Sequence, residues 1–181
     1  MSTIIRNGTL VTMNSRRDIL RADILIEGDR IKEIGELKGY KAQQEIDAAG
    51  MLVIPGLIQS HVHLCQTLFR GAADDMELMD WLKQRIWPLE AAHDEESLYY
   101  SALLASAELI SGATTSIIDM GTVRHTNSLF EAVKQSGLRY LGGKCMMDCG
   151  DEVPEKLIDS REKSLQESMD LFERWNGQEQ G

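Results

Sequence analysis

The stretch PGLIQSHVHL, residues 55–64, decides the fold, because a short apolar segment runs directly into two histidines spaced at i and i+2. Side chains alternate between the two faces of a β-strand, so His61 and His63 are expected to project from one face of a strand end, with Val62 on the other. Neutral imidazole is a common ligand of divalent metal ions, and a catalytic zinc usually takes three protein ligands and one water molecule. The pair therefore indicates two ligands of a metal site, unless the rings are simply solvated at the strand end.

After Met51 the sequence alternates between apolar, β-branched stretches and stretches with helical spacing, which is typical of parallel βα units. We predict strands that begin at Leu57 and that span residues 114–119 and 138–147. Helices are predicted over residues 78–87, 95–111, 127–136 and 160–175. Pro88 is expected to end the first helix. The last helix is expected to carry an apolar stripe formed by Leu165, Met169 and Phe172.

Residues 3–54 read differently, as short strands separated by turns that contain glycine. Strand patterns cover residues 4–5, 10–13, 22–26, 30–34 and 45–47, and EGDR at 27–30 predicts a hairpin turn. These strands are too few and too short to close a stable sandwich, and their unpaired edges need a covering segment. A partner segment is therefore implied for these strands.

Two further motifs follow the histidine pair, TLFRG at residues 67–71 and WPLE at residues 87–90. Together with residues 55–64 they resemble the cyclic deaminase and chlorohydrolase branch of the amidohydrolase superfamily, and the resemblance runs along the whole chain. In that family, the first strand of a (β/α)8 barrel supplies two histidine ligands, and later strands supply further histidines and an aspartate. The metal-bound hydroxide then displaces an amino group or a halide from a heterocycle.

The resemblance implies an α/β fold, with the first units of a (β/α)8 TIM-type barrel over residues 55–181 and part of a small β-sandwich domain over residues 1–54. A complete barrel takes about 250 residues, so about four βα units fit at most. The polar stretch GQEQG at 177–181 carries no closing strand. We therefore expect an amino-terminal fragment that is inactive by itself, because the family's remaining ligands and its acid/base glutamate have no candidates in it.

For the metal, the resemblance implies zinc, or another divalent ion such as Fe2+, held by His61 and His63. Bound zinc can lower the pKa of its water to about 7, which produces hydroxide at neutral pH. Asp119 lies at the end of the second predicted strand and is expected either to orient a ligand histidine or to serve packing or capping.

Four residues are candidate contacts to the substrate: Glu90, Gln66, Lys144 and His125. Glu90 matches a position that accepts hydrogen bonds from ribose hydroxyls in nucleoside-deaminating relatives, and its two oxygens could hold vicinal hydroxyls together. The alternative is a solvated glutamate after a helix-ending proline. Gln66 could meet a heterocycle edge and His125 could line the mouth of the site, with ordinary loop polarity as the alternative for each.

Lys144 is predicted on the third strand, where nucleoside-deaminating relatives have an arginine that contacts the substrate. Lysine is a point donor rather than a planar fork. This difference puts adenosine-type substrates in doubt and leaves room for guanine-like, pterin-like or triazine substrates. The alternative is a lysine that reaches solvent or pairs with Asp148. Arg70 is expected to be structural, and His93 is expected to lie on the surface at a helix start.

Composition is that of an ordinary soluble protein, with 43% hydrophobic and 27% charged residues. A formal net charge of −10 argues against nucleic acid and anionic membranes as partners. The chain has no long apolar run and no secretory signal pattern, so the predicted location is the cytoplasm. Cys65, Cys145 and Cys149 lack a close CxxC spacing, which predicts reduced, mostly buried thiols.

The leading hypothesis is a metal-dependent deaminase that acts on carbon–nitrogen bonds other than peptide bonds, in a purine-like or related nitrogen heterocycle. A chlorohydrolase or cyclic-amide hydrolase of the same fold is the alternative among enzymes. From another class, the chain could be a non-catalytic binding or assembly module whose histidines are incidental. The expected partner is a small heterocyclic molecule, and the full-length protein is expected to form homo-oligomers.

Overall fold

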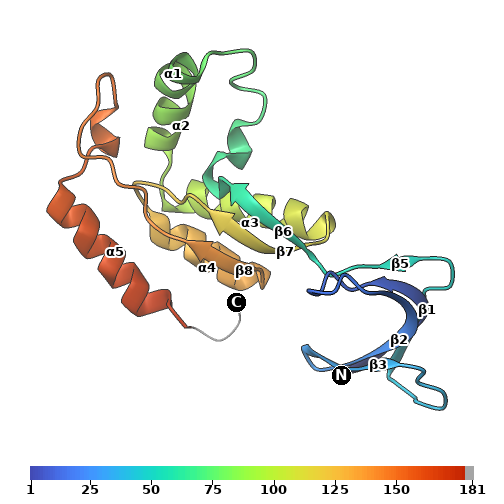
Figure 1. Cartoon of the computed structure of the whole chain (residues 1–181). Helices are drawn as coiled ribbons and strands as arrows, with labels where there is room; N and C mark the ends of the chain where they lie inside the picture. Colours follow the sequence, from blue (N-terminus) through green and yellow to red (C-terminus); the bar gives the residue numbers. More distant parts are fainter. Residues whose placement is uncertain (178–181) are drawn as a thin grey trace. The chain divides into compact units, whose positions relative to one another are not determined.

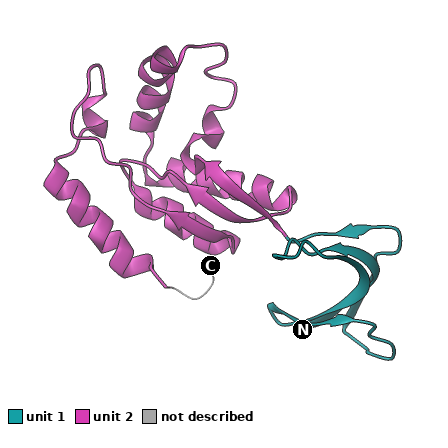
Figure 2. Ribbon diagram, viewed as in Figure 1, with its two compact units in different colours: residues 1–55 teal, residues 56–181 magenta. Residues whose placement is uncertain are grey.

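The computed structural model describes residues 1–177, which divide into two compact units between Pro55 and Gly56 (Figure 2). Residues 178–181 lie outside the described residues. They form most of the polar stretch 177–181, in which the sequence analysis finds no closing strand. Among the described residues, no helix combines the length and the apolar character needed to cross a membrane.

The first unit is a five-stranded sheet (Figure 1). Its strands are β1 (Ser2–Val11), β2 (Ile19–Glu27), β3 (Arg30–Gly35), β4 (Gln44–Asp47) and β5 (Leu52–Val53). The order is β3-β2-β1-β4, and β5 pairs with the later part of β1. The predicted hairpin turn is confirmed, because Gly28 takes a φ of 63° between the antiparallel strands β2 and β3.

The sequence divides β1 into two strands, and the structure joins them through a bulge. The pairing register with β2 shifts between Ile5 and Gly8, and Asn7 takes a φ of 61°. A bulge bends a strand without ending it, which explains why turn-forming residues occur inside a continuous strand. A Cβ atom at Gly8 would lie 2.8 Å from the Val53 side chain of β5, so glycine permits this close approach.

The second unit holds a three-stranded sheet in the order β6-β7-β8, in which neighbouring strands are parallel. The strands are β6 (Leu57–Val62), β7 (Thr114–Asp119) and β8 (Arg139–Gly142). Val62, Asp119 and Gly142 are register partners, so the carboxyl ends of all three strands lie at one edge of the sheet. The predicted parallel βα organisation is confirmed for these strands.

Helices α3 (Glu95–Ser111) and α4 (Thr126–Ser136) pack against each other beside the sheet (Figure 1). Leu98 of α3, Leu129 of α4 and Ile117 of β7 are among the residues of one buried cluster. Helix α3 has the predicted bounds, and α4 begins one residue before the predicted start at 127. Asp94 forms a capping box at the start of α3, and Gly137 is left-handed after α4.

The prediction that Pro88 ends a helix is wrong. The chain stays helical through α1 (Leu78–Trp81), the π-helix η2 (Leu82–Ile86) and α2 (Trp87–Ala92). Proline lacks the N–H that would bond the carbonyl four residues earlier. That carbonyl belongs to Gln84, and it accepts a hydrogen bond of 3.1 Å from the Arg85 guanidinium instead. The wider π turn and this side-chain donor together accommodate the proline.

The third predicted strand is shorter than expected, because β8 ends at Gly142 and the following residues have no ladder partner. They bond to the loop after β7 instead, where the Cys145 N–H donates to the Thr122 carbonyl at 2.9 Å. Gly121 in that loop takes a φ of 77°, and a Cβ on it would overlap the Gly143 carbonyl oxygen. This loop contact takes the chain out of the sheet before Lys144.

The predicted last helix is confirmed as α5 (Arg161–Trp175), with Ser160 accepting a hydrogen bond from the Lys163 N–H at its start. The expected apolar stripe is solvent-exposed within the described residues, since Leu165, Met169 and Phe172 are 49%, 58% and 64% exposed. The helix packs instead through Trp175, whose ring stacks on Phe130 of α4 with ring centres 5.5 Å apart.

Candidate metal and substrate site

His61 and His63 lie together at the carboxyl end of β6, where the structure places them on the same side of the chain. His61 is the last residue but one of β6, and His63 is the first residue after the strand. Their ring centres are 5.2 Å apart and the ring planes make an angle of 67°. Two imidazoles on one tetrahedral zinc ion, with Zn–N distances of about 2.0–2.1 Å, have ring centres roughly 5 Å apart.

The donor chemistry and the ring spacing therefore fit a shared divalent ion, but the pair is not a complete site. Within residues 1–177, no group of three or more histidine, cysteine, aspartate or glutamate side chains is arranged to hold a metal ion. A catalytic zinc usually has three protein ligands. His61 and His63 can thus supply only part of a ligand set.

Asp119 at the end of β7 is a buried carboxylate that contacts the chain beside His63. Its Oδ1 accepts a hydrogen bond of 3.1 Å from the Leu64 N–H, and its Oδ2 accepts one of 2.9 Å from the Tyr140 hydroxyl of β8. Burial raises the pKa of the Asp119 carboxyl, although these hydrogen bonds and the nearby His63 oppose the increase. The carboxylate joins three strand ends and fixes the backbone position of the residue after His63.

Glu90 reaches the same region from α2, because the helix continues past Pro88. Its Oε1 accepts hydrogen bonds from the Gln66 amide at 2.9 Å and from the Cys65 thiol at 3.5 Å. Cys65 and Gln66 both lie on the 3-10 helix η1 (Leu64–Phe69), which follows the histidine pair. The structure thus brings together two of the four predicted substrate contacts, Glu90 and Gln66.

His93 directly precedes the N-cap of α3, as expected of a residue at a helix start, but it is half-buried rather than on the surface. Its Nε2 bonds the Cys65 carbonyl at 2.9 Å, its Nδ1 bonds the Ser97 hydroxyl at 3.0 Å, and its ring stacks on Phe69 with centres 5.0 Å apart. The sequence offers no local signal for this role, because η1 and His93 meet only through tertiary folding. Both ring nitrogens are used, so His93 fixes η1 in place.

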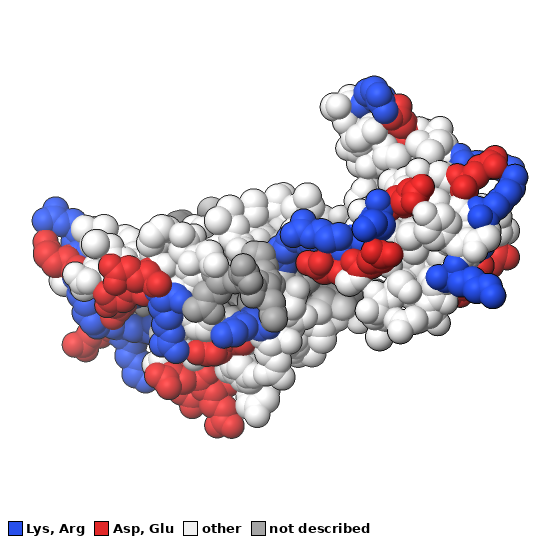
Figure 3. All heavy atoms as spheres, turned by 90° about the horizontal axis from the view of Figure 1, so that it is seen from below, with Lys and Arg blue, Asp and Glu red and all other residues white. Residues whose placement is uncertain are grey.

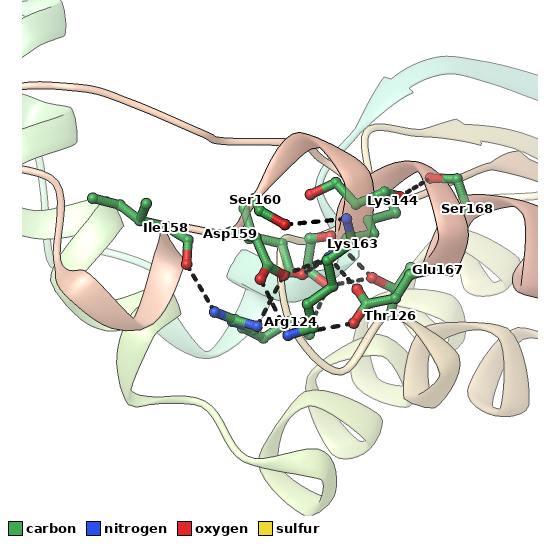
Figure 4. A network of polar contacts seen from close by, with 12 residues as sticks. Arg124, Thr126, Lys144, Ile158, Asp159, Ser160, Lys163, Glu167 and Ser168 are labelled. Carbon is green, nitrogen blue, oxygen red and sulfur yellow. Dashed lines mark hydrogen bonds and ion pairs between the residues drawn. The ribbon is translucent and has the colours of Figure 1, made fainter.

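The Lys144 side chain points into a network of ion pairs beside α5 (Figure 4). It is 1% exposed, its Nζ lies 2.7 Å from Glu167 and 3.8 Å from Asp159, and it also donates to the Val123 carbonyl. Arg124 and Lys163 bind the same Asp159 carboxylate at 2.9 Å and 3.1 Å. These contacts hold the Lys144 ammonium inside the protein, so in this structure it does not point toward a substrate. The sequence analysis offered Asp148 as an alternative partner, but the ion pairs are with Glu167 and Asp159.

His125 and Arg70 lie at other positions around the unit. His125 is left-handed with a φ of 58° directly before α4, and its Nδ1 lies 3.8 Å from a Glu95 carboxylate oxygen. Arg70 makes two hydrogen bonds to Glu108, at 3.0 Å and 2.6 Å, as expected of a structural residue.

On the face drawn in Figure 3, acidic and basic side chains of the described residues are interspersed.

All three cysteines are free thiols, but only Cys65 is fully buried. Burial raises the pKa of Cys65, with a further contribution from Glu90. Burial likewise raises the pKa of Cys145 to about 11. Both thiols therefore stay protonated at neutral pH and act as weak hydrogen-bond donors. The cysteine spacing of the sequence carries no sign of this role for Cys65.

The fold and this edge of the sheet define a mixed α/β protein with polar side chains gathered at the carboxyl ends of parallel strands. The family model described as "Amidohydrolase family" matches residues 52–176. The chain belongs to the amidohydrolase family, so the predicted resemblance is confirmed.

Three similar proteins are informative. The 5-methylthioadenosine/S-adenosylhomocysteine deaminase of Carboxydothermus hydrogenoformans is 36% identical over 184 residues, covering 100% of this chain and 40% of that protein. The 5'-deoxyadenosine deaminase of Methanocaldococcus jannaschii is 44% identical over 134 residues, covering 73% of this chain and 31% of that protein. A solved adenosine deaminase from Xanthomonas campestris with bound zinc aligns with a TM-score of 0.85 at 26% identity, covering 98% and 40%. The chain thus spans 40% or less of the length of these relatives.

Proposed function

We propose that the intact protein is a metal-dependent hydrolase that removes ammonia from a purine-like heterocycle. The observation that carries this proposal is the 5.2 Å spacing of the His61 and His63 rings at the end of β6, in a chain of the amidohydrolase family. The names of the similar proteins support a deaminase and favour adenosine-type nucleosides as substrates.

In this proposal, residues 55–181 are the first βα units of a (β/α)8 barrel, and residues 1–54 are part of a β-sandwich domain. The parallel order β6-β7-β8 with α3 and α4 as crossover helices supports the barrel assignment. In such barrels the active site lies at the carboxyl ends of the strands. The histidine pair and Asp119 lie at that edge.

His61 and His63 would hold a divalent ion, for which zinc is the proposed identity. Such an ion supplies activation of a water molecule for attack on an aromatic carbon that carries an amino group. Asp119 would keep the His63 backbone in place through the Leu64 N–H. Glu90 would accept a hydrogen bond from the substrate, and His125 remains a predicted contact at the rim.

We also propose a cytoplasmic protein that forms homo-oligomers and acts on a small heterocyclic molecule rather than on nucleic acid or a membrane. The net charge of −10 supports the last point, since anionic partners favour basic surfaces.

The test is ammonia release by the purified intact protein from 5'-methylthioadenosine, S-adenosylhomocysteine, 5'-deoxyadenosine and guanine, together with metal analysis. We expect release from at least one of these compounds and stoichiometric divalent metal. The His61→Ala and His63→Ala variants should lose both the ammonia release and the bound metal. The His125→Ala variant, which removes an imidazole elsewhere, should keep the metal. Release of chloride from a triazine without deamination would favour the chlorohydrolase alternative. A protein that holds no metal and is unchanged by either substitution would favour a binding module.

A further inference from the structure

The dipeptide asparagine–glycine occurs twice in the chain, as Asn7–Gly8 and as Asn176–Gly177. In this dipeptide the main-chain nitrogen of the second residue readily attacks the asparagine side chain, because glycine has no Cβ to hinder the approach. The attack needs the asparagine Cγ and the glycine nitrogen to reach a suitable geometry, which a folded backbone can permit or prevent. The two copies share their local chemistry, so the structure around each decides whether it reacts.

Asn7–Gly8 lies at the bulge of β1, which pairs with both β2 and β4. The Asn7 N–H donates to Asp23 at 3.0 Å, and its Nδ2 donates to Asp47 at 2.9 Å. Gly8 is buried and is the register partner of Ala22 in β2. Attack by the Gly8 nitrogen requires the Asn7 side chain to leave Asp47 and the backbone to rotate within the sheet. The sheet therefore protects this copy.

Asn176–Gly177 follows directly after α5, and both residues are exposed. The Asn176 N–H donates to the Phe172 carbonyl at 2.9 Å. Within residues 1–177, no group bonds the Asn176 side-chain amide or the Gly177 N–H. Rotation between Cα and the carbonyl carbon of Asn176 therefore breaks no hydrogen bond in the described part of the chain. This copy can reach the attack geometry without unfolding α5.

We propose that Asn176 is a modification site that loses its side-chain amide spontaneously through a cyclic imide, while Asn7 stays intact in the folded protein. The Gly177 nitrogen gives up its proton and bonds to Cγ of Asn176, and the Cγ–Nδ2 bond breaks so that Nδ2 leaves as ammonia. Water then opens the imide. Addition of water at Cγ gives aspartate, and addition at the main-chain carbonyl carbon gives isoaspartate, whose main chain runs through Cβ. This inference is independent of the proposed deaminase activity.

Both products place a carboxylate at the carboxyl end of α5. An ordinary aspartate has a pKa of about 3.9, so this group is ionised at neutral pH. The last carbonyls of a helix carry partial negative charge and repel it. The same helix end holds Trp175, which stacks on Phe130 and donates from Nε1 to Asn127 at 3.0 Å. We therefore expect the conversion to weaken the contact of α5 with α4 and to lower the unfolding temperature.

The test is peptide mapping by mass spectrometry after incubation of the intact protein in mildly alkaline buffer made with heavy-oxygen water. The peptide with Asn176 should give two new species, aspartate and isoaspartate, each with the amide NH2 replaced by a hydroxyl and one heavy oxygen gained. The peptide with Asn7 should stay unchanged over the same time. In urea, where the sheet is lost, Asn7 should convert at a rate within a few-fold of that of Asn176.

Two variants examine the reacting groups. Gly177→Ala adds a Cβ that meets nothing within 4 Å but hinders the attacking nitrogen, so conversion at Asn176 should slow several-fold. Asn176→Gln, whose longer side chain closes a less favourable ring, should not convert, and its unfolding temperature should not fall on incubation. Asn176→Asp should reproduce the charge of the product, and its unfolding temperature should lie below that of fresh wild type.

A second pair of variants examines the protection of Asn7. Asp47→Ala frees the Asn7 side chain, so we expect conversion at Asn7 to rise. Asp18→Ala is the matched control, because it frees Asn14, which donates to Asp18 at 2.9 Å but does not precede a glycine. Conversion at Asn14 should stay negligible.

Three results would overturn the inference. The first is an unchanged Asn176 in the incubated protein, and the second is equal conversion of both copies while the protein is folded. The third is a Gly177→Ala variant that converts as fast as the wild type, since the Gly177 nitrogen would then not be the attacking group. Faster conversion at Asn176 than at Asn7 in the folded protein, together with similar rates in urea, would support it.

Discussion

Tyr140 on β8 donates a hydrogen bond of 2.9 Å to Asp119 at the end of β7. The other oxygen of the same carboxylate binds the Leu64 N–H beyond β6. One buried carboxylate therefore couples the carboxyl ends of three parallel strands, and it does so next to His63. This relationship makes the geometry of the candidate metal site depend on a phenol two strands away.

Replacing Tyr140 with phenylalanine should destabilise the protein and weaken metal retention. The change removes one hydrogen bond to a charged, buried oxygen, for which the expected loss is about 1.5–3 kcal/mol. Thermal unfolding of the metal-free protein measures the first effect, and competition with a chelator measures the second. Tyr100→Phe is the control, because Tyr100 is 56% exposed. An unchanged unfolding temperature in Tyr140→Phe would show that the bond contributes nothing.

The Gly121→Ala substitution should be far more damaging than Gly137→Ala. Both glycines are left-handed, with φ of 77° and 76°. A Cβ at Gly121 would overlap the Gly143 carbonyl oxygen, whereas a Cβ at Gly137 meets nothing within 4 Å. Gly137→Ala should cost about 1 kcal/mol from backbone strain alone. Gly121→Ala should also displace the loop that carries Cys145, and soluble yield and unfolding temperature will measure the difference. Equal losses in the two variants would argue against the close approach.

Stability should fall in acid partly through Asp159. Burial raises the pKa of this carboxyl, but Lys163, Arg124 and Lys144 outweigh burial and hold the pKa below its usual value. A lowered folded-state pKa stabilises the protein above the unfolded pKa of about 3.9, and this contribution is lost as pH falls through the folded-state value. Urea unfolding should therefore show a large difference between wild type and Asp159→Asn at pH 7 and a much smaller one near pH 3. A difference that does not depend on pH would contradict this.

Lys144→Met should affect stability more than substrate binding. The Lys144 side chain is 1% exposed beside Glu167 and Asp159. Its removal takes one cation from the buried Asp159 carboxylate, which keeps Arg124 and Lys163, so we expect a loss of about 1.5–3 kcal/mol, as for one hydrogen bond to a charged group. Lys163→Met, at a side chain 51% exposed, should cost less. Unfolding temperature and KM on the same preparations separate the two roles. A raised KM with unchanged stability would instead support the predicted substrate contact.

Local signals explain most of what was predictable about the fold. Three such signals are the capping residues at the start of α3, the left-handed Gly137 after α4 and the β-branched run of β7. Each signal acts on residues next to it in the chain, so the element it forms depends little on the rest of the protein. The Pro88 prediction failed because a neighbouring arginine supplied the missing donor, and β8 was shortened because the loop at Gly121 bonds the following residues.

By itself the sequence determined the family, through its motifs, and the α/β pattern and the closeness of His61 and His63 at a strand end, because strand periodicity and capping are properties of neighbouring residues. Only the tertiary structure decided what surrounds that pair. The Gln66–Glu90 bond joins residues 24 apart, and the Leu64–Asp119 bond joins residues 55 apart. Helix packing and strand register bring such residues together, and no spacing along the chain encodes the distance between them.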